Sequence, residues 1–290
     1  MKKLLASTAV LVAFAAISPA SAADMALKAV PAAAPAWSWA GPYIGGNVGY
    51  GWASDPSTLT GTTTTTQVRE SDADTPTPTF TPLGTTTAVA AASGRVRPDG
   101  AVGGFQAGYN LQSNSFVYGL EGDIQISGQR GTNTLCITAG CPAGSGIATE
   151  SVKLPWFGTF RGRIGFTPSP TWLVYATGGL AVTEVKEALS GGVVGGTPAS
   201  LFGANMNTTR AGFAVGGGVE TAIAAHWSLK VEYLYMGFGS VNIAGTGAPV
   251  TVTTGIAPPR ILLLTTTTLA GAVSTRISDN VVRVGVNYHF

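Results

Sequence analysis

Polar and apolar residues alternate through eight segments of the chain. In the last of them, 281–290, Val282, Val284 and Val286 fall on one face and Arg283 and Gly285 on the other. A β-strand has a side-chain period of two, so this pattern predicts a strand with one apolar and one polar face. The other segments are 43–52, 102–111, 116–127, 156–166, 172–182, 209–223 and 227–235. Segment 172–182 is apolar on both faces, which leaves its orientation open. Each segment is close to the ~9–11 residues that a tilted strand needs to cross a bilayer.

The links between these segments alternate in length. Three are short, 112–115, 167–171 and 224–226, and four are long, 53–100, 128–155, 183–208 and 236–279. Outer-membrane barrels have short periplasmic turns and long extracellular loops. The alternation therefore predicts an up-and-down antiparallel barrel with both ends in the periplasm. Runs of the β-favouring residue Thr, at 62–66 and 265–268, predict that the outer strands extend above the membrane as hairpins.

Aromatic residues collect at the ends of the predicted strands. Near the short links and the termini lie Tyr109, Phe116, Phe166, Trp172, Trp227, Tyr288 and Phe290, and near the long links lie Tyr50, Trp52, Trp156 and Tyr235. Transmembrane barrels carry aromatic girdles at both interfaces, where one end of the ring system is apolar and the other wet. Aromatics that filled the core of a soluble sandwich would instead lie at strand centres.

Composition narrows the class. Charged residues are 10% of the chain, against roughly 25% in ordinary soluble domains, and the mean hydropathy is +0.29. After the first 22 residues, no apolar run is long enough for a spanning helix. Lipid supplies no hydrogen-bond partners, so only helices and closed barrels can cross it. The sequence therefore predicts an all-β, eight-stranded transmembrane barrel. A net charge of +2 without a basic block gives no sign of nucleic-acid binding.

The amino-terminal region predicts export. Lys2 and Lys3 precede an apolar run at 4–17, and Ala20-Ser21-Ala22 forms an A-x-A cleavage site. Residues 1–22 are therefore predicted to be a signal peptide. Residues 23–38, rich in Ala and Pro, are predicted to form a flexible periplasmic tail, which leaves 39–290 as the barrel.

Nine charged residues fall on the predicted inner face. They are Glu121, Asp123, Arg161, Arg163, Arg210, Glu220, Lys230, Glu232 and Arg283. Alignment of the strands on their short links places Glu121 opposite Arg161. It also places Glu220 opposite Lys230, and Arg283 is expected to partner Glu232. Two roles stay open: a polar pore constriction or gate, and a structural network that neutralises buried charge. The second is favoured because eight strands leave little open lumen.

The remaining candidates for chemistry are few. Cys136 and Cys141 share one outer link, and export favours a short disulfide between them over free thiols or pairing elsewhere. His226-Trp227-Ser228 resembles the H-x-S pair of outer-membrane lipid A deacylases. His226, however, falls in a periplasmic turn, on the wrong side for outer-leaflet lipid, so catalysis is not expected. Two isolated histidines, His226 and His289, do not make a metal site, and no cofactor is expected.

Sequence motifs in every predicted strand resemble one family. WAGPYIGGNVGY at 39–50 is similar to the first strand of the alphaproteobacterial outer-membrane "porin family" proteins, small barrels also called outer-membrane immunogenic or surface-antigen proteins. The segments that follow in the same order are GGFQAGYN (103–110), VYGLEGDIQ (117–125), FRGRIGF (160–166), YATGGLA (175–181), VGGGVE (215–220), WSLKVEYLY (227–235) and VRVGVNYHF (282–290). The resemblance implies an eight-stranded barrel in the outer membrane of a Gram-negative cell and no enzymatic activity. It also implies that Val286, Tyr288 and Phe290 belong to the carboxyl-terminal assembly signal.

These observations predict an envelope structural and surface-antigen protein whose lumen is largely filled by side chains. Two alternatives stay open: a small passive diffusion porin, and an adhesin or receptor that binds an extracellular partner through its loops. The expected partners are outer-membrane lipid and lipopolysaccharide, the barrel-assembly machinery and periplasmic chaperones.

Overall fold

The computed structural model describes residues 37–71, 77–136, 146–193, 202–256 and 261–290. The elements in these residues are β-strands. Their bounds are β1 Gly41–Trp52, β2 Asp55–Ser71, β3 Thr79–Val96, β4 Asp99–Ser113, β5 Phe116–Cys136, β6 Gly146–Ser169, β7 Trp172–Val193, β8 Phe202–Ala224, β9 Trp227–Thr246, β10 Val250–Ile256 and β11 Ile261–His289. The described residues contain no helix long and apolar enough to cross a membrane. The predicted signal peptide and residues 23–36 of the predicted tail lie outside the described residues.

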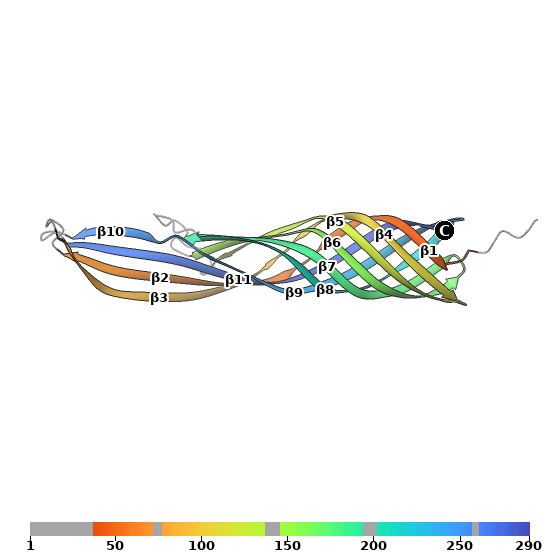
Figure 1. Ribbon diagram of the computed structural model, residues 1–290, viewed down its shortest axis with the longest axis horizontal. Helices are drawn as coiled ribbons and strands as arrows, with labels where there is room; N and C mark the ends of the chain where they lie inside the picture. Colours follow the sequence, from red (N-terminus) through yellow and green to blue (C-terminus); the bar gives the residue numbers. More distant parts are fainter. Residues whose placement is uncertain (1–36, 72–76, 137–145, 194–201, 257–260) are drawn as a thin grey trace, which may run out of the picture. The chain divides into compact units, whose positions relative to one another are not determined.

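The strands form one antiparallel sheet that returns to its first strand. The order of hydrogen-bonded neighbours is β1-β4-β5-β6-β7-β8-β9-β11-β2-β3, β10 pairs with β11, and β1 also pairs with β11. Figure 1 shows these strands winding side by side around a common axis. The prediction of an all-β antiparallel fold is therefore confirmed. The described chain has eleven strands rather than the eight predicted.

The three additional strands, and the extra length of the others, come from segments predicted to be loops. Segment 53–100 holds β2 and β3, and segment 236–279 holds β10 and about two thirds of β11. β5 continues to Cys136 and pairs there with β6. The expectation of long loops is thus wrong for much of their length, whereas the hairpins predicted from the threonine runs are present as β2 with β3 and β10 with β11. Threonine and other β-favouring residues let these segments pair with one another, and pairing satisfies backbone groups that a loop would leave to water.

Strand β11 joins the two ends of the sheet. Its carboxyl-terminal part pairs with β1, from His289 opposite Tyr43 to Asn280 opposite Trp52. Its amino-terminal part pairs with β2 instead. Its other edge pairs with β9 from Tyr288 to Ala270 and with β10 from Thr267 to Ile261. The terminal strand therefore closes the ring between the first strand and β9, as the sequence predicts.

Side chains are distributed inside out relative to a soluble protein. Phe105 and Ile126 on the outer face are 75% and 77% exposed, whereas Arg161 on the inner face is fully buried. The orientation of 172–182, which the sequence leaves open, is settled by burial. Leu173 and Tyr175 point inward, and alternate residues point outward.

The interior is filled in layers, which the inward side chains of β6 follow in order. Arg163 and Arg161 lie in a charged layer, and Phe157, Leu154 and Val152 lie in an apolar cluster beyond it. The members of that first cluster are Val96, Val102, Val152, Leu154, Phe157, Ala181, Val185, Ala214, Leu234, Met236, Phe238, Val241, Ile277 and Val281. A second apolar cluster contains Leu59, Leu135, Ala148, Leu189, Phe202, Ile243, Leu269 and Val273. At the opposite end, Trp39, Val117, Leu173 and Tyr175 pack below the charges.

Candidate functional site

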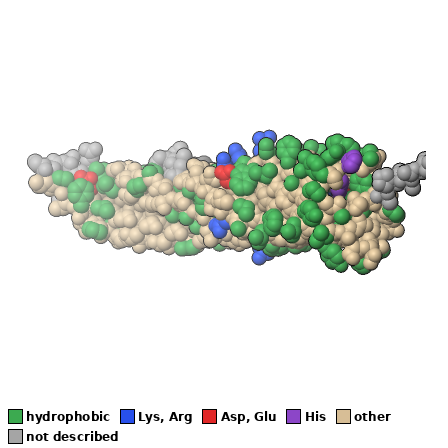
Figure 2. Space-filling view, turned by 45° about the vertical axis from the view of Figure 1, so that its right-hand side comes forward, with side chains coloured by type: hydrophobic (Ala, Val, Ile, Leu, Met, Phe, Trp, Pro, Cys, Tyr) green, Lys and Arg blue, Asp and Glu red, His purple; other side chains and the backbone are tan. Residues whose placement is uncertain are grey.

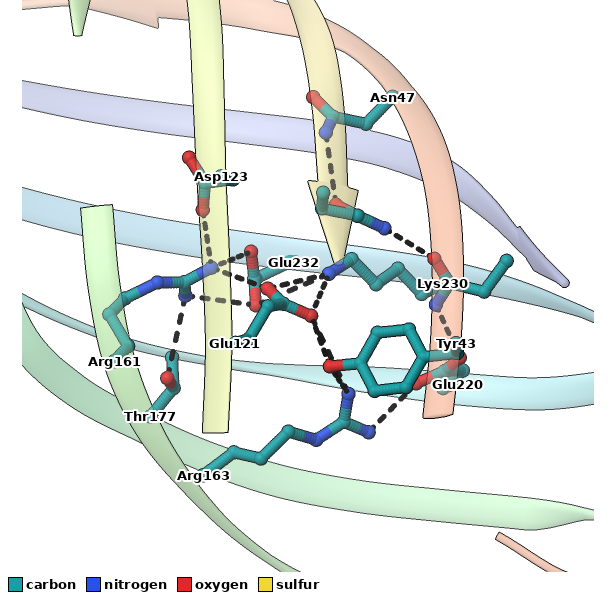
Figure 3. Close-up of polar contacts among 12 residues, drawn as sticks. Tyr43, Asn47, Glu121, Asp123, Arg161, Arg163, Thr177, Glu220, Lys230 and Glu232 are labelled. Carbon is teal, nitrogen blue, oxygen red and sulfur yellow. Dashed lines mark hydrogen bonds and ion pairs between the residues drawn. The ribbon is translucent and has the colours of Figure 1, made fainter. Parts of the chain in front are cut away.

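Eight of the nine charged residues predicted to face inward meet in one buried network. They are Glu121 and Asp123 on β5, Arg161 and Arg163 on β6, Glu220 on β8, Lys230 and Glu232 on β9, and Arg283 on β11. Residues two positions apart on a strand share a face, so three of these strands each contribute a pair of charges. Figure 3 shows the side chains converging from several strands onto the carboxylates.

Arg161 lies at the centre of the network. Its guanidinium contacts Glu121 at 2.6 Å, Asp123 at 2.9 Å and Glu232 at 3.2 Å. The strand register places Glu121 directly opposite Arg161, as the sequence alignment of the strands predicts. One guanidinium with five donors can bind several carboxylates at once, which an ammonium group does less well.

Arg283 binds the same acids from the other side of the lumen. It contacts Glu232 at 2.5 Å and Asp123 at 3.0 Å. Glu232 is also its cross-strand neighbour, which is the expected pairing. Two arginines from β6 and β11 therefore share the acids of β5 and β9.

Lys230 and Glu220 differ from the sequence expectation. They lie opposite each other in the register of β8 and β9, but the Lys230 ammonium contacts Glu121 at 2.9 Å. Glu220 instead binds Arg163 at 2.8 Å. The reason is the narrow lumen: long side chains reach strands on the far wall as easily as they reach the neighbouring strand.

Uncharged residues that the sequence analysis did not assign to the site complete it. The Tyr43 hydroxyl donates to Glu121 at 2.7 Å and accepts from Arg163 at 2.9 Å. An amide chain runs from Asn47 to Gln106 at 2.9 Å and from Gln106 to Asn287 at 2.6 Å. Asn287 then donates to Glu220 at 2.6 Å. The alternation of side chains along a strand already places Asn47, Gln106 and Asn287 on the polar face. The two-residue period of the sequence could therefore have identified them as lumen residues.

Arg210 is the one predicted lumen charge outside this network. It lies on β8 opposite Thr183 of β7, beyond the charged layer. Among the described ion pairs, none involves Arg210. Its prediction as a network member is therefore wrong, because β8 continues outward well past the level of the other charges.

The two residues of the H-x-S triplet have different partners. The His226 ring contacts the backbone oxygen of His289 at 2.9 Å. The Ser228 hydroxyl is buried, donates to Glu220 at 2.5 Å and contacts the His289 Nε2 atom at 3.0 Å. The His289 ring also packs against Trp37 and Trp39, with centroids 5.2 and 5.7 Å away. Ser228 and His289 thus join the end of the charged layer.

A second pair of buried acids lies farther out, between the two apolar clusters. Glu150 accepts a hydrogen bond from Ser57 at 2.5 Å and another from Thr275. Glu187 is 2% exposed, and neither of its carboxyl oxygens has a donor among the described residues. Burial and the adjacent Glu150 raise the pKa of Glu187 to about 8. This pair is absent from the sequence predictions because its strands were expected to be loops.

Cys136 lies beyond these acids. Cys136 ends β5, and Cys141 lies outside the described residues. The disulfide between them therefore stays a prediction. Of the predicted assembly-signal residues, Val286 and Tyr288 lie on β11 and Phe290 directly follows it.

Comparison with known proteins places the chain in a family. A model of the outer membrane protein beta-barrel domain matches residues 8–290. The chain belongs to this family. It is 34% identical to a 31 kDa outer-membrane immunogenic protein of Brucella melitensis biotype 1, over 93% of each chain. It is 28% identical to a 25 kDa outer-membrane immunogenic protein of Brucella abortus biovar 1, over 85% of this chain and 90% of that one. A 22 kDa outer membrane protein of Rhizobium leguminosarum bv. viciae is 31% identical over 46% of this chain and 50% of that one.

This family membership gives the location, which is the outer membrane. The inside-out burial of the strands fits that solvent, because the exposed apolar side chains face lipid there. The charged network described above is then the interior of an outer-membrane barrel.

Proposed function

We propose that this protein is an envelope structural and surface protein whose barrel is closed to solutes. The observation that carries the proposal is the layered filling of the interior. The charged layer and the apolar layers beyond it consist of buried side chains from opposite walls. The relatives named as outer-membrane immunogenic proteins support a role as a surface antigen.

The proposed spanning unit is an eight-stranded ring of β1, β4, β5, β6, β7, β8, β9 and β11. Its support is the band of exposed apolar side chains along these strands, such as Val48, Phe105 and Leu180. Strands β2, β3 and β10 would then stand outside the cell, and the turns at Ser113–Phe116 and Ala224–Trp227 would face the periplasm. Figure 1 shows β2, β3 and β10 at the end of the sheet away from the carboxyl terminus.

A passive diffusion porin is the runner-up, and it requires a continuous water path. The buried Arg161, Phe157 and Leu154 lie at successive levels across that path. An enzymatic function is not proposed, because the relatives are named for immunogenicity and Ser228 is buried in the charged layer. The proposed partners are outer-membrane lipid, lipopolysaccharide, periplasmic chaperones and the barrel-assembly machinery, the last through Val286, Tyr288 and Phe290.

Surface labelling of intact cells tests the orientation. Arg69→Cys on β2 and Ser113→Cys at the end of β4 each add one exposed thiol. A membrane-impermeant maleimide is expected to label Arg69→Cys in intact cells and Ser113→Cys only after the outer membrane is broken. Labelling of the native chain under the same conditions measures the background signal from its own cysteines. Labelling of Ser113→Cys alone in intact cells would overturn the proposal.

A further inference from the structure

Basic side chains collect at one level on the outside of the barrel. Of the 16 basic residues, Lys2, Lys3, Lys28 and Arg260 lie outside the described residues. Six of the other twelve are exposed just beyond the outer aromatic residues: Arg95, Arg97, Arg130, Lys153, Lys186 and Arg276. Figure 2 shows Lys and Arg gathered where the hydrophobic region of the surface gives way to polar atoms. This level is where lipid headgroups would meet the protein.

Three of these residues form a row across adjacent strands. Arg130 on β5 lies directly opposite Lys153 on β6, and Lys153 lies directly opposite Lys186 on β7. Neighbouring strands are about 4.8 Å apart, so the row spans roughly 10 Å of backbone. Like charges directly opposite each other destabilise a sheet. Repulsion within the row therefore destabilises the barrel when no ligand is bound. An anion bound at the row would offset this repulsion.

The acids nearby do not neutralise the row. Lys186 contacts Glu184 at 3.5 Å, and this is the one ion pair of the row among the described residues. Asp99 lies opposite Arg130, and its carboxylate also accepts a hydrogen bond from the Tyr50 hydroxyl. The three cations of the row therefore face two carboxylates. The row keeps a net positive charge.

A polar hollow adjoins the row. It has a volume of about 590 Å³ and lies between β3 and β5, where Arg95, Arg97, Thr132 and Asn133 line it. The backbone of Arg97 packs against Gly131, the residue after Arg130, and leaves no space there for a Cβ. The hollow and the row thus form one surface, the basic patch of Arg95, Arg97, Arg130, Lys153 and Lys186.

Apolar side chains continue from the basic patch toward the membrane. On the same strands, Ile126, Phe160 and Leu180 are 77%, 59% and 67% exposed. A lipid held here would place its acyl chains on these residues and its phosphates on the patch. Arg and Lys bind phosphate through charge-assisted hydrogen bonds, which are stronger than neutral ones.

We propose that the basic patch binds the phosphate groups of the outer-leaflet glycolipid, lipopolysaccharide. The proposal rests on the proposed orientation, in which β2 and β3 lie outside the cell. The site fits a ligand with more than one phosphate, because the positive charge extends over β3, β5, β6 and β7 rather than surrounding a single point.

Titration of the purified, refolded protein in zwitterionic detergent tests this site. The probes are purified lipopolysaccharide, the same material after enzymatic dephosphorylation, and inorganic phosphate. The test variant is Arg130→Gln/Lys153→Gln/Lys186→Gln, and Arg69→Gln, an exposed change far out on β2, is the control. Each Lys or Arg near a membrane surface strengthens binding to anionic lipid about fivefold. The triple variant is therefore expected to bind lipopolysaccharide on the order of 100-fold more weakly. Arg69→Gln is expected to bind as the native chain does.

Two further results are expected. Dephosphorylation weakens binding to the native protein to about the level of the triple variant, and inorganic phosphate at equal phosphate concentration does not compete. Without lipid, the triple variant unfolds at the native temperature or above it, because opposed like charges are gone. If it does not refold, Lys153→Gln and Arg97→Gln are measured singly, and each is expected to bind about fivefold more weakly.

Equal binding of lipopolysaccharide by the native chain and the charge variants would overturn the proposal. So would full competition by inorganic phosphate, which would indicate a free-anion site. The titration is independent of orientation in the cell. If the surface-labelling result fails while the charge-dependent binding of lipopolysaccharide is observed, that outcome therefore counts against the proposed orientation alone.

Discussion

Arg161 binds three buried carboxylates, those of Glu121, Asp123 and Glu232. Removing one partner of a buried ion pair leaves uncompensated charge, which costs roughly 3–5 kcal/mol. Arg161→Ala is therefore expected to lower the free energy of unfolding by about that amount, measured by heat or urea unfolding of the refolded protein. Arg69→Ala, an exposed change, is the control. An Arg161→Ala protein as stable as the native chain would contradict the role given to the network.

The raised pKa of Glu187 predicts how the stability of the protein depends on pH. Its pKa is raised to about 8 in the folded protein, against roughly 4.3 in an unfolded chain. Between these values the folded state binds more protons than the unfolded state, so stability falls as pH rises toward 8 and then levels off. Glu187→Gln is expected to be more stable than the native chain at pH 9 and to lose this part of the pH dependence.

The control for that prediction is Glu184→Gln, three residues away on the outer face of β7. Hydrogen bonds, that from Asn207 first, lower the pKa of Glu184, so the fall in stability toward pH 8 is expected to persist in this variant. Unfolding midpoints from pH 5 to pH 9 provide the measurement. A native pH profile in Glu187→Gln would contradict the assignment.

The sequence predicts whether each charged side chain faces the inside or the outside of the barrel, but it does not predict all of the ion-pair partners. Glu121 opposite Arg161 follows from register. The contact of Lys230 with Glu121 does not, because side chains that cross a narrow lumen meet residues from strands that are not neighbours. The place of Tyr43 between Glu121 and Arg163 was missed for the same reason.

At the scale of the strands, ring closure depends on glycine where β1 meets β11. A Cβ on Gly49 would overlap the carbonyl oxygen of Val282, whereas a Cβ on Gly46 has its nearest contact 3.8 Å away. Gly49→Ala is therefore expected to reduce the refolded fraction and lower the unfolding midpoint, and Gly46→Ala to leave both near native. The altered electrophoretic mobility of folded barrels before boiling gives the refolded fraction. Equal behaviour of the two variants would contradict the close packing of β1 on β11.

The eight alternating segments locate strands of the structure, but they do not give the full length of those strands. Alternation in 116–127 marks the first part of β5, but the strand runs on to Cys136. Its extension has little hydrophobic contrast, and its pairing with β6 involves residues that are not close in sequence. The threonine runs predict the hairpin of β2 and β3. They do not predict that β2 also pairs with β11, because the two segments are far apart in the sequence.

At the scale of the whole molecule, the ring of strands encloses an interior that is filled by side chains. Buried aromatic, charged and apolar layers follow one another along the lumen. The sequence predicts a filled lumen from strand number alone, because eight strands leave room only for side chains. The second apolar layer and the buried pair of Glu150 and Glu187 could not be anticipated, since they lie in the outer extension of the strands.

Planar-bilayer conductance of the purified, refolded protein tests the filled lumen most directly. A large water-filled porin in the same bilayer system shows that insertion of a conducting barrel would be detected. Insertion of this protein is verified separately, by protease protection in vesicles of the same lipid. The layered interior predicts no steady current above the bare bilayer. Reproducible conductance steps from the pure protein would contradict it.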